Sequence, residues 1–176
     1  MGLDTLYTKN MKGEKMILDH PKNTATKIAL SVHGRQKDKR GEPYMGHIED
    51  VEFRVRQLGP TFSVVAILHD SIEDAKSKRV RKKIRNEIRG LFGEIVYDAV
   101  MAISKRPDED YFKDYLVRVA SNPIALQVKL ADIKANLQHL PMMEDLATRE
   151  RLRQQYHIAM RALGNQIIVH PAATSS

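Results

Sequence analysis

Residues 61–74 read Thr61-Phe-Ser-Val-Val-Ala-Ile-Leu-His-Asp-Ser-Ile-Glu-Asp74. The apolar run Val64–Leu68 predicts that Thr61–Asp74 is the buried central helix of the domain. His69 and Glu73 are four residues apart, as are Asp70 and Asp74, so a helix would carry all four on one stripe. Three carboxylates at the end of an apolar helix repel one another, and a divalent cation is the simplest compensation. The alternative is an acidic, solvated helix end. The four-residue pattern favours the metal site.

The rest of the chain is also predominantly helical in pattern. Gly59-Pro60 and Asn122-Pro123 are strong start signals, and the polar stretch Lys37–Gly46 predicts a loop. No segment shows sustained period-2 alternation, so we predict an all-α fold. The expected helices cover residues 24–33, 47–58, 61–74, 77–91, 93–104, 108–120, a segment beginning at 122–123, and 148–169. We expect one domain over residues 21–170, a flexible N-terminal segment at 1–20 and a tail at 171–176.

Composition narrows the class of protein. Apolar residues make up 42% of the 176 residues, and no apolar run reaches the 18 residues of a membrane-spanning helix. The charged N-terminus does not resemble a secretory signal. The chain has no cysteine, which excludes disulfides, thiolate ligands and cysteine nucleophiles. We therefore expect a cytoplasmic protein with no membrane partner.

The positive charge is concentrated in one stretch. Residues 76–89 hold eight basic side chains and one acidic one, which accounts for the whole formal net charge of +7. We expect a helix whose inward face carries Val80, Ile84, Ile88 and Leu91, with most of its Lys and Arg facing solvent near the mouth of the site. Such a surface prefers phosphates, nucleotides or nucleic acid. The alternative is a solvated helix surface with no further role.

A metal needs more ligands than His69 and Asp70. His47 follows the polar loop at the start of a predicted helix, and Asp132 interrupts the apolar segment Val128-Lys-Leu-Ala-Asp132. Two histidines and two aspartates give mixed nitrogen and oxygen ligation. This set suits Mn²⁺, Fe²⁺, Co²⁺, Ni²⁺ or Zn²⁺ and leaves positions for water and substrate.

These motifs, in this order, resemble the HD-domain metal-dependent phosphohydrolases, and within them the RelA/SpoT-type (p)ppGpp hydrolases, including small alarmone hydrolases. The resemblance covers about residues 25–163. It rests on the following strings: His33-Gly-Arg-Gln36-Lys-Asp-Lys39-Arg-Gly41-Glu-Pro43-Tyr44-Met-Gly-His47, Ile67–Asp74, Phe92-Gly93, Ser104-Lys105, Val128–Asn136 and Tyr156.

The resemblance implies an HD-domain helical bundle and a role for each matched residue. His47, His69, Asp70 and Asp132 would bind one divalent metal ion, expected to be Mn²⁺. Glu73 and Asp74 would orient or deprotonate the attacking water. The nucleotide pocket would be lined by Lys39, Lys129, Asn136 and Tyr156.

The segment from Arg35 to Ile48, which the resemblance implies is the substrate-recognition loop, departs from the family pattern at three positions. Asp38 stands where the family has an arginine that contacts the base, Arg35 stands for a glycine, and Ile48 stands for a proline. An acid at position 38 removes a stacking cation and adds a charge that phosphates disfavour. We therefore expect looser or different base recognition, with Lys39 or Arg40 able to compensate.

The leading hypothesis is hydrolysis of a phosphate or pyrophosphate ester of a nucleotide. In the alarmone case, guanosine 3′,5′-bis(diphosphate) would lose its 3′ pyrophosphate. One alternative is a broader nucleotidase. Another is a nucleic-acid-binding protein that uses residues 76–89 and carries a vestigial HD site.

Overall fold

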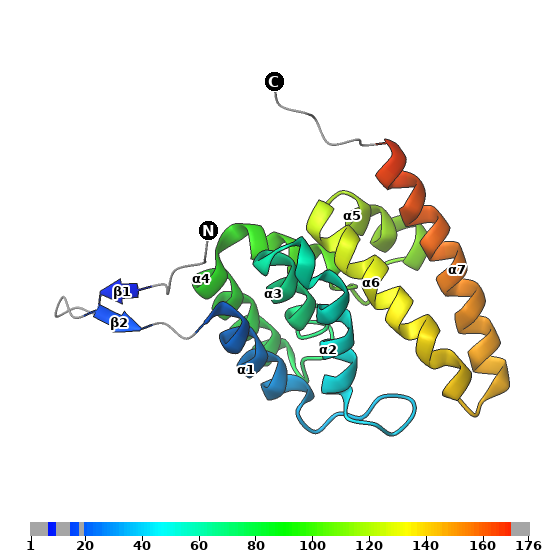
Figure 1. The fold of residues 1–176 in the computed structure, drawn as a ribbon, viewed down its shortest axis with the longest axis horizontal. Coiled ribbons are helices and arrows are strands. Elements are labelled where there is room, and N and C mark those ends of the chain that lie inside the picture. Colours follow the sequence, from blue (N-terminus) through cyan, green and yellow to red (C-terminus); the bar gives the residue numbers. More distant parts are fainter. Residues whose placement is uncertain (1–6, 10–14, 18–19, 170–176) are drawn as a thin grey trace.

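The computed structural model describes residues 7–9, 15–17 and 20–169 of the chain, so the predicted tail at 171–176 lies outside the described residues. The fold is a bundle of helices, as predicted (Figure 1). The α-helices are α1 (Pro21–His33), α2 (Tyr44–Val55), α3 (Pro60–Leu68), α4 (Lys78–Ile103), α5 (Leu116–Ala120), α6 (Pro123–His139) and α7 (Leu146–Val169). Three short helical segments connect them: η1 (Arg56–Leu58), η2 (Tyr111–Tyr115) and η3 (Leu140–Met142).

A strand pair near the N-terminus is the one departure from helical structure in the named elements. Strand β1 (Tyr7–Lys9) pairs antiparallel with β2 (Lys15–Ile17), and Tyr7 lies opposite Ile17. This pair was not expected from the sequence, because strands of three residues are too short to produce a period-2 signal.

Helix α3 is the centre of the bundle. All six residues from Ser63 to Leu68 are buried, and the helix contacts α1, α2, α4 and α6. Gly59 and Pro60 start it as expected: Gly59 has a φ of 125°, and Pro60 stands in the first turn. The apolar run therefore fixes the position of the residues that follow it.

The predicted helix over residues 61–74 ends earlier than expected, at Leu68. His69 keeps helical backbone angles, and residues 69–74 continue as turns closed by bonds from Ser71 N to Leu68 O and from Asp74 N to Asp70 O. In this turn the carboxylates of Asp70 and Asp74 accept hydrogen bonds from side chains outside it, Tyr44 and Gln36. Glu73 and Asp74 therefore do not share a helical stripe with His69 and Asp70.

Helix α4 combines the two helices that the sequence predicted on either side of Phe92-Gly93. Gly93 has φ 80° and ψ −178°, which kinks the helix at that point. In its first half Ile84 and Ile88 are buried, as expected, but Val80 and Leu91 are 40% and 50% exposed. The predicted inward face was therefore right at Ile84 and Ile88 and wrong at Val80 and Leu91.

The α6 helix begins at the predicted signal. The Asn122 side chain accepts hydrogen bonds from the amides of Ile124 and Ala125, and Pro123 occupies the first turn. Helix α6 packs between α2, α4 and α7, which places its central residues in the interior (Figure 1). Among the described residues, no helix is both long and apolar enough to cross a bilayer.

The kink at Gly93 predicts opposite effects for two glycines of the same helix. Gly93→Ala should destabilise the protein by about 1–3 kcal/mol, because its backbone region is almost restricted to glycine. Gly90→Ala, three residues earlier in regular helix and open space, should stabilise it by about 0.5–1 kcal/mol. Urea unfolding measures both, and equal shifts of the same sign would contradict the role given to Gly93.

Candidate metal centre and active site

Three helices bring His47, His69 and Asp132 together. His47 is in the first turn of α2, His69 is the residue that follows α3, and Asp132 lies in the middle of α6. All three side chains are buried, and one potential ligand atom from each lies within 4.8 Å of the other two. They are separated by up to 85 residues in sequence, so the bundle itself assembles a possible metal site.

The His69 ring is oriented for ligation. Its Nδ1 lies 2.7 Å from the Ala66 carbonyl oxygen, which fixes Nδ1 as the donor and leaves the Nε2 lone pair facing the cluster. Nε2 is 2.9 Å from Asp70 Oδ2 and 3.9 Å from Asp132 Oδ1, yet it is buried without a hydrogen bond. A buried, unpaired nitrogen that faces two carboxylates fits a divalent cation.

The two aspartates are held by neighbouring side chains. Tyr44 donates its hydroxyl hydrogen bond to Asp70 Oδ2. Asp132 Oδ2 accepts from Lys129 Nζ at 2.8 Å, and Asp132 Oδ1 accepts from Asn136 Nδ2 at 2.6 Å and lies 3.2 Å from His47 Nε2. Both carboxylates are therefore fixed in direction before any ligand binds.

The electrostatics of the cluster favour a positive charge at its centre. Burial would lower the pKa of His69, but the carboxylates of Asp70 and Asp132 outweigh it and raise that pKa to about 9. Burial would raise the pKa of Asp132, but Lys129 and His47 hold it below its ordinary value. The pKa of Asp70 is likewise lowered, by His69 against the effect of burial. A cation can supply the same compensation as the proton on His69.

Glu73 and Asp74 point to different surroundings. Glu73 accepts a hydrogen bond from the Lys105 amide at 2.9 Å, and its partial burial together with the Asp70 charge raises its pKa. Asp74 accepts from Gln36 Nε2 at 2.8 Å and lies 3.7 Å from His33 Nδ1. The first acid therefore faces the site, and the second ties the turn after α3 to the loop after α1.

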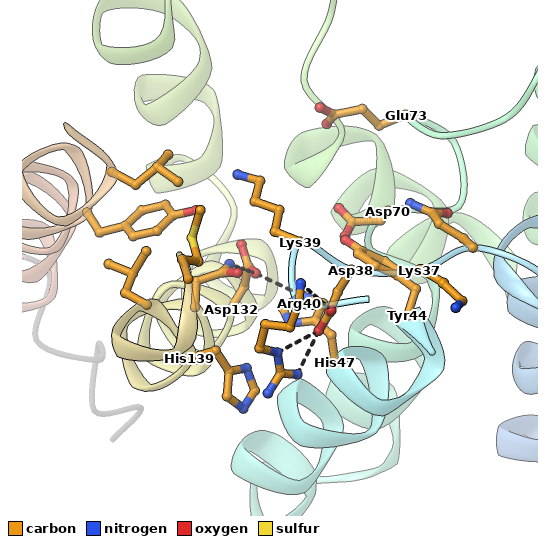
Figure 2. Close-up of a pocket in the computed structure, with 16 residues that line it drawn as sticks. Lys37, Asp38, Lys39, Arg40, Tyr44, His47, Asp70, Glu73, Asp132 and His139 are labelled. Atoms are coloured by element: carbon orange, nitrogen blue, oxygen red, sulfur yellow. Dashed lines mark hydrogen bonds and ion pairs between the residues drawn. The ribbon is translucent and has the colours of Figure 1, made fainter. Parts of the chain in front are cut away.

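A cavity of about 410 Å³ opens above the cluster, with His47, Asp70 and Asp132 in its wall. Of the predicted substrate-binding residues, Lys39, Asn136 and Tyr156 line it, and Lys129 does not. Figure 2 shows Lys39 extending from the loop into the cavity and Glu73 at the opposite edge from His139. Burial raises the pKa of Tyr156 to about 12, so its hydroxyl remains a donor.

The loop between α1 and α2 forms a tight turn over this cavity. Lys37 and Pro43 form an isolated antiparallel β-bridge, and the Asp38 amide donates to the Glu42 carbonyl oxygen. Gly41 in this turn has a φ of 83°. The Asp38 carboxylate accepts from the backbone amides of Arg40 and Glu42 and lies 2.6 Å from the Arg40 guanidinium (Figure 2). Its charge is thus neutralised within the loop, which removes the basis for expecting it to repel phosphates.

Several positioning residues were missed by the sequence analysis. Tyr44 was quoted only as part of a motif, although its place one turn before His47 indicates the same helix face. Arg118 donates to the carbonyls of Met101, Ala102 and Ser104 and pairs with Glu109 at 2.5 Å, so it fixes the segment that presents the Lys105 amide to Glu73. No local sequence signal identifies that role, because all its partners come from another element.

The cluster predicts one divalent cation per chain. His69→Ala should lose most of the bound metal, because it removes the nitrogen that is free for ligation. His157→Ala, on the exposed surface of α7, is the matched control and should retain it. Metal analysis after dialysis against Mn²⁺ gives the stoichiometry. Equal metal content in the parent and in His69→Ala would overturn the assignment.

The loop geometry predicts local opening when Asp38 is truncated. Asp38→Ala removes a charge-assisted set of bonds, so trypsin should cleave after Lys39 or Arg40 about tenfold faster. Asp38→Asn keeps an oxygen for the two backbone amides and should show a smaller increase. Cleavage at the parent rate in both variants would show that the loop does not depend on this side chain.

Sequence comparison relates the chain to alarmone enzymes. The chain is 28% identical over 141 residues to guanosine-3′,5′-bis(diphosphate) 3′-pyrophosphohydrolase of Aquifex aeolicus. This alignment covers 72% of the chain and 19% of the Aquifex protein. The chain is 29% identical over 135 residues to GTP pyrophosphokinase rsh of Brucella ovis (70% and 17%), and 27% identical over 139 residues to the probable 3′-pyrophosphohydrolase of Synechocystis (72% and 18%). The chain spans less than a fifth of the length of these curated relatives. No family model matches.

Structure comparison gives a similar fold. A solved structure described as "A metazoan ortholog of SpoT hydrolyzes ppGpp and plays a role in starvation responses" superposes with a TM-score of 0.66 at 20% identity, over 86% of this chain and 88% of the other. At that identity the likeness establishes the fold. The resemblance to RelA/SpoT-type ppGpp hydrolases that the motifs indicated is confirmed by these relatives, and the chain has the helical HD-domain fold.

Proposed function

We propose that the chain is a metal-dependent phosphohydrolase that removes the 3′ pyrophosphate from guanosine 3′,5′-bis(diphosphate) or a closely related nucleotide. The observation that carries the proposal is the position of His69 Nε2, which is buried without a hydrogen bond and faces the carboxylates of Asp70 and Asp132 at the base of the cavity. The names of the Aquifex and Synechocystis relatives supply the substrate class.

The proposed cofactor is one divalent cation held by His47, His69, Asp70 and Asp132. Two imidazoles and two carboxylates suit Mn²⁺, which is the expected ion, and they suit other first-row divalent metals as well. Such an ion supplies Lewis acidity, which acidifies water and stabilises negative charge on phosphate oxygens. Tyr44, Lys129 and Asn136 hold the two carboxylates in place.

Glu73 is the proposed general base. Its raised pKa brings it closer to the working pH, which improves a carboxylate as a proton acceptor. The bond from the Lys105 amide holds one carboxylate oxygen and leaves the other for water. The family resemblance implies that Asp74 shares this role. Its bond to Gln36 supports a positioning role, in which it holds the recognition loop against the turn that carries Glu73.

The nucleotide would bind in the 410 Å³ cavity, which suits a ligand of that size. Lys37 and Lys39 line it and have no ion-pair partner in the described part of the chain, so they are available to phosphates. Asn136 of α6 and Tyr156 of α7 add polar groups to the lining of the cavity. Lys129 is buried beside Asp132 and would act on the substrate only through that carboxylate.

A broader nucleotidase is the second candidate, and the loop favours it. Position 38 carries an aspartate, and this aspartate holds the Arg40 guanidinium, which is then not free to stack on a base. Incubation with Mn²⁺ and a panel of ppGpp, nucleoside mono-, di- and triphosphates and NADPH separates the two candidates. Release of pyrophosphate from ppGpp alone supports the first. Release of phosphate from many nucleotides supports the second, and no hydrolysis of any substrate refutes both.

The role of Glu73 predicts a turnover defect without loss of metal. Glu73→Gln keeps the shape and removes the base, so kcat should fall by about 10²–10⁴-fold. Glu49→Gln, at an exposed position on α2, is the matched control and should leave kcat unchanged. Steady-state kinetics with metal analysis measure both quantities. Near-normal turnover in Glu73→Gln would refute the assignment.

A further inference from the structure

A second, smaller cavity lies on the other side of Glu73 from the metal cluster. It measures about 160 Å³, and four of its lining residues are cationic: Arg81, Arg85, Lys105 and Arg106. Glu73 lines both cavities, so its side chain stands in the wall between them. The residues come from the start of α4 and from the segment that follows α4.

Arg81 and Arg85 differ from the other cations of the basic segment. They are four residues apart on α4 and share one face, and both are partly buried, whereas Lys82 and Lys83 between them are exposed. Arg81 Nε donates to the Ile72 carbonyl oxygen at 3.0 Å, which fixes its guanidinium beside the turn that carries Glu73. Arg85 Nε is buried and has no hydrogen-bond partner.

Three of the four cations that line this cavity have no ion-pair partner among the described residues, and Glu73 is the one carboxylate in its wall. Within the described part of the chain, Arg81, Arg85 and Lys105 form no ion pair, and Arg106 lies 3.7 Å from Glu109. Arginine cannot relieve the repulsion by losing its proton. A multiply charged anion would offset that repulsion and accept hydrogen bonds from the guanidinium groups that line the cavity.

We propose that Arg81, Arg85 and Lys105 form an anion-binding subsite for a phosphate or pyrophosphate group, separated from the metal cluster by Glu73. This cavity is smaller than the roughly 300–1,000 Å³ of pockets that hold whole organic ligands. It therefore admits a phosphate-sized group without its nucleoside.

Two sources of this group are chemically equivalent. One is free pyrophosphate, which the proposed reaction releases, and the other is the distal phosphate of a bound substrate. The existence of the subsite does not depend on the proposed function, but its use by product or substrate rests on it.

Binding of inorganic pyrophosphate to the full chain in the presence of a chelator tests the subsite without the metal or the reaction. By calorimetry, Arg85→Gln should bind pyrophosphate about tenfold or more weakly than the parent, as expected for loss of a charge-assisted contact. Lys82→Gln, on the exposed face of the same helix, removes the same charge and should bind within about twofold of the parent.

Three outcomes would overturn the subsite: no binding by the parent, equal binding by parent and Arg85→Gln, or equal loss in Arg85→Gln and Lys82→Gln. The last would assign the effect to the field of the whole helix. A thermal shift checks folding and gives a second readout, because pyrophosphate should raise the Tm of the parent and not that of Arg85→Gln.

Kinetics with the metal-loaded protein and ppGpp then distinguish the two sources. If the subsite holds the distal phosphate of the substrate, Arg85→Gln raises KM, and pyrophosphate competes with substrate in the parent only. If it holds the released product, Arg85→Gln leaves KM unchanged and weakens inhibition by pyrophosphate. Failure of the parent to hydrolyse ppGpp would refute the proposed function and leave the calorimetric result for the subsite intact.

Discussion

Two imidazoles and two carboxylates meet where α2, α3 and α6 converge, and the fold has to compensate for removing them from water. Burying such groups is costly unless each has a partner. Here the Ala66 carbonyl, Tyr44, Lys129 and Asn136 each hold one member of the cluster. The only buried nitrogen of the cluster left without a hydrogen bond is His69 Nε2, and it faces the centre. The packing of α2, α3 and α6 thus brings His47, His69 and Asp132 to one buried cluster.

The loop over the cavity depends on the same turn that ends α3. Asp74 bonds to Gln36, so the segment that carries the two acids is tied to the segment that carries Lys37 and Lys39. Within that loop, Asp38 is used to hold Arg40 and two backbone amides. The residues proposed for recognition and for catalysis are therefore linked through a few polar contacts.

Charge is distributed so that acids lie at the base of the larger cavity and cations surround it. Lys37 and Lys39 stand on one side of Glu73, and Arg81 and Arg85 stand on the other. A polyanionic ligand would meet unpaired cations on both sides of the carboxylate proposed as the base. The excess charge of residues 76–89 is therefore divided between an exposed surface and two arginines that line a cavity.

The sequence by itself determined the helical fold, the central position of α3, the start of α6 at Asn122 and the candidate ligands, because these follow from local periodicity, caps and motif order. It could not determine that α3 stops at Leu68, that Asp74 turns to Gln36, or that Lys129 supports Asp132 from outside the cavity. Nor could it separate Arg81 and Arg85 from Lys82 and Lys83. Those distinctions depend on which side chain of another element lies within hydrogen-bond distance, and only the packing of the helices decides that.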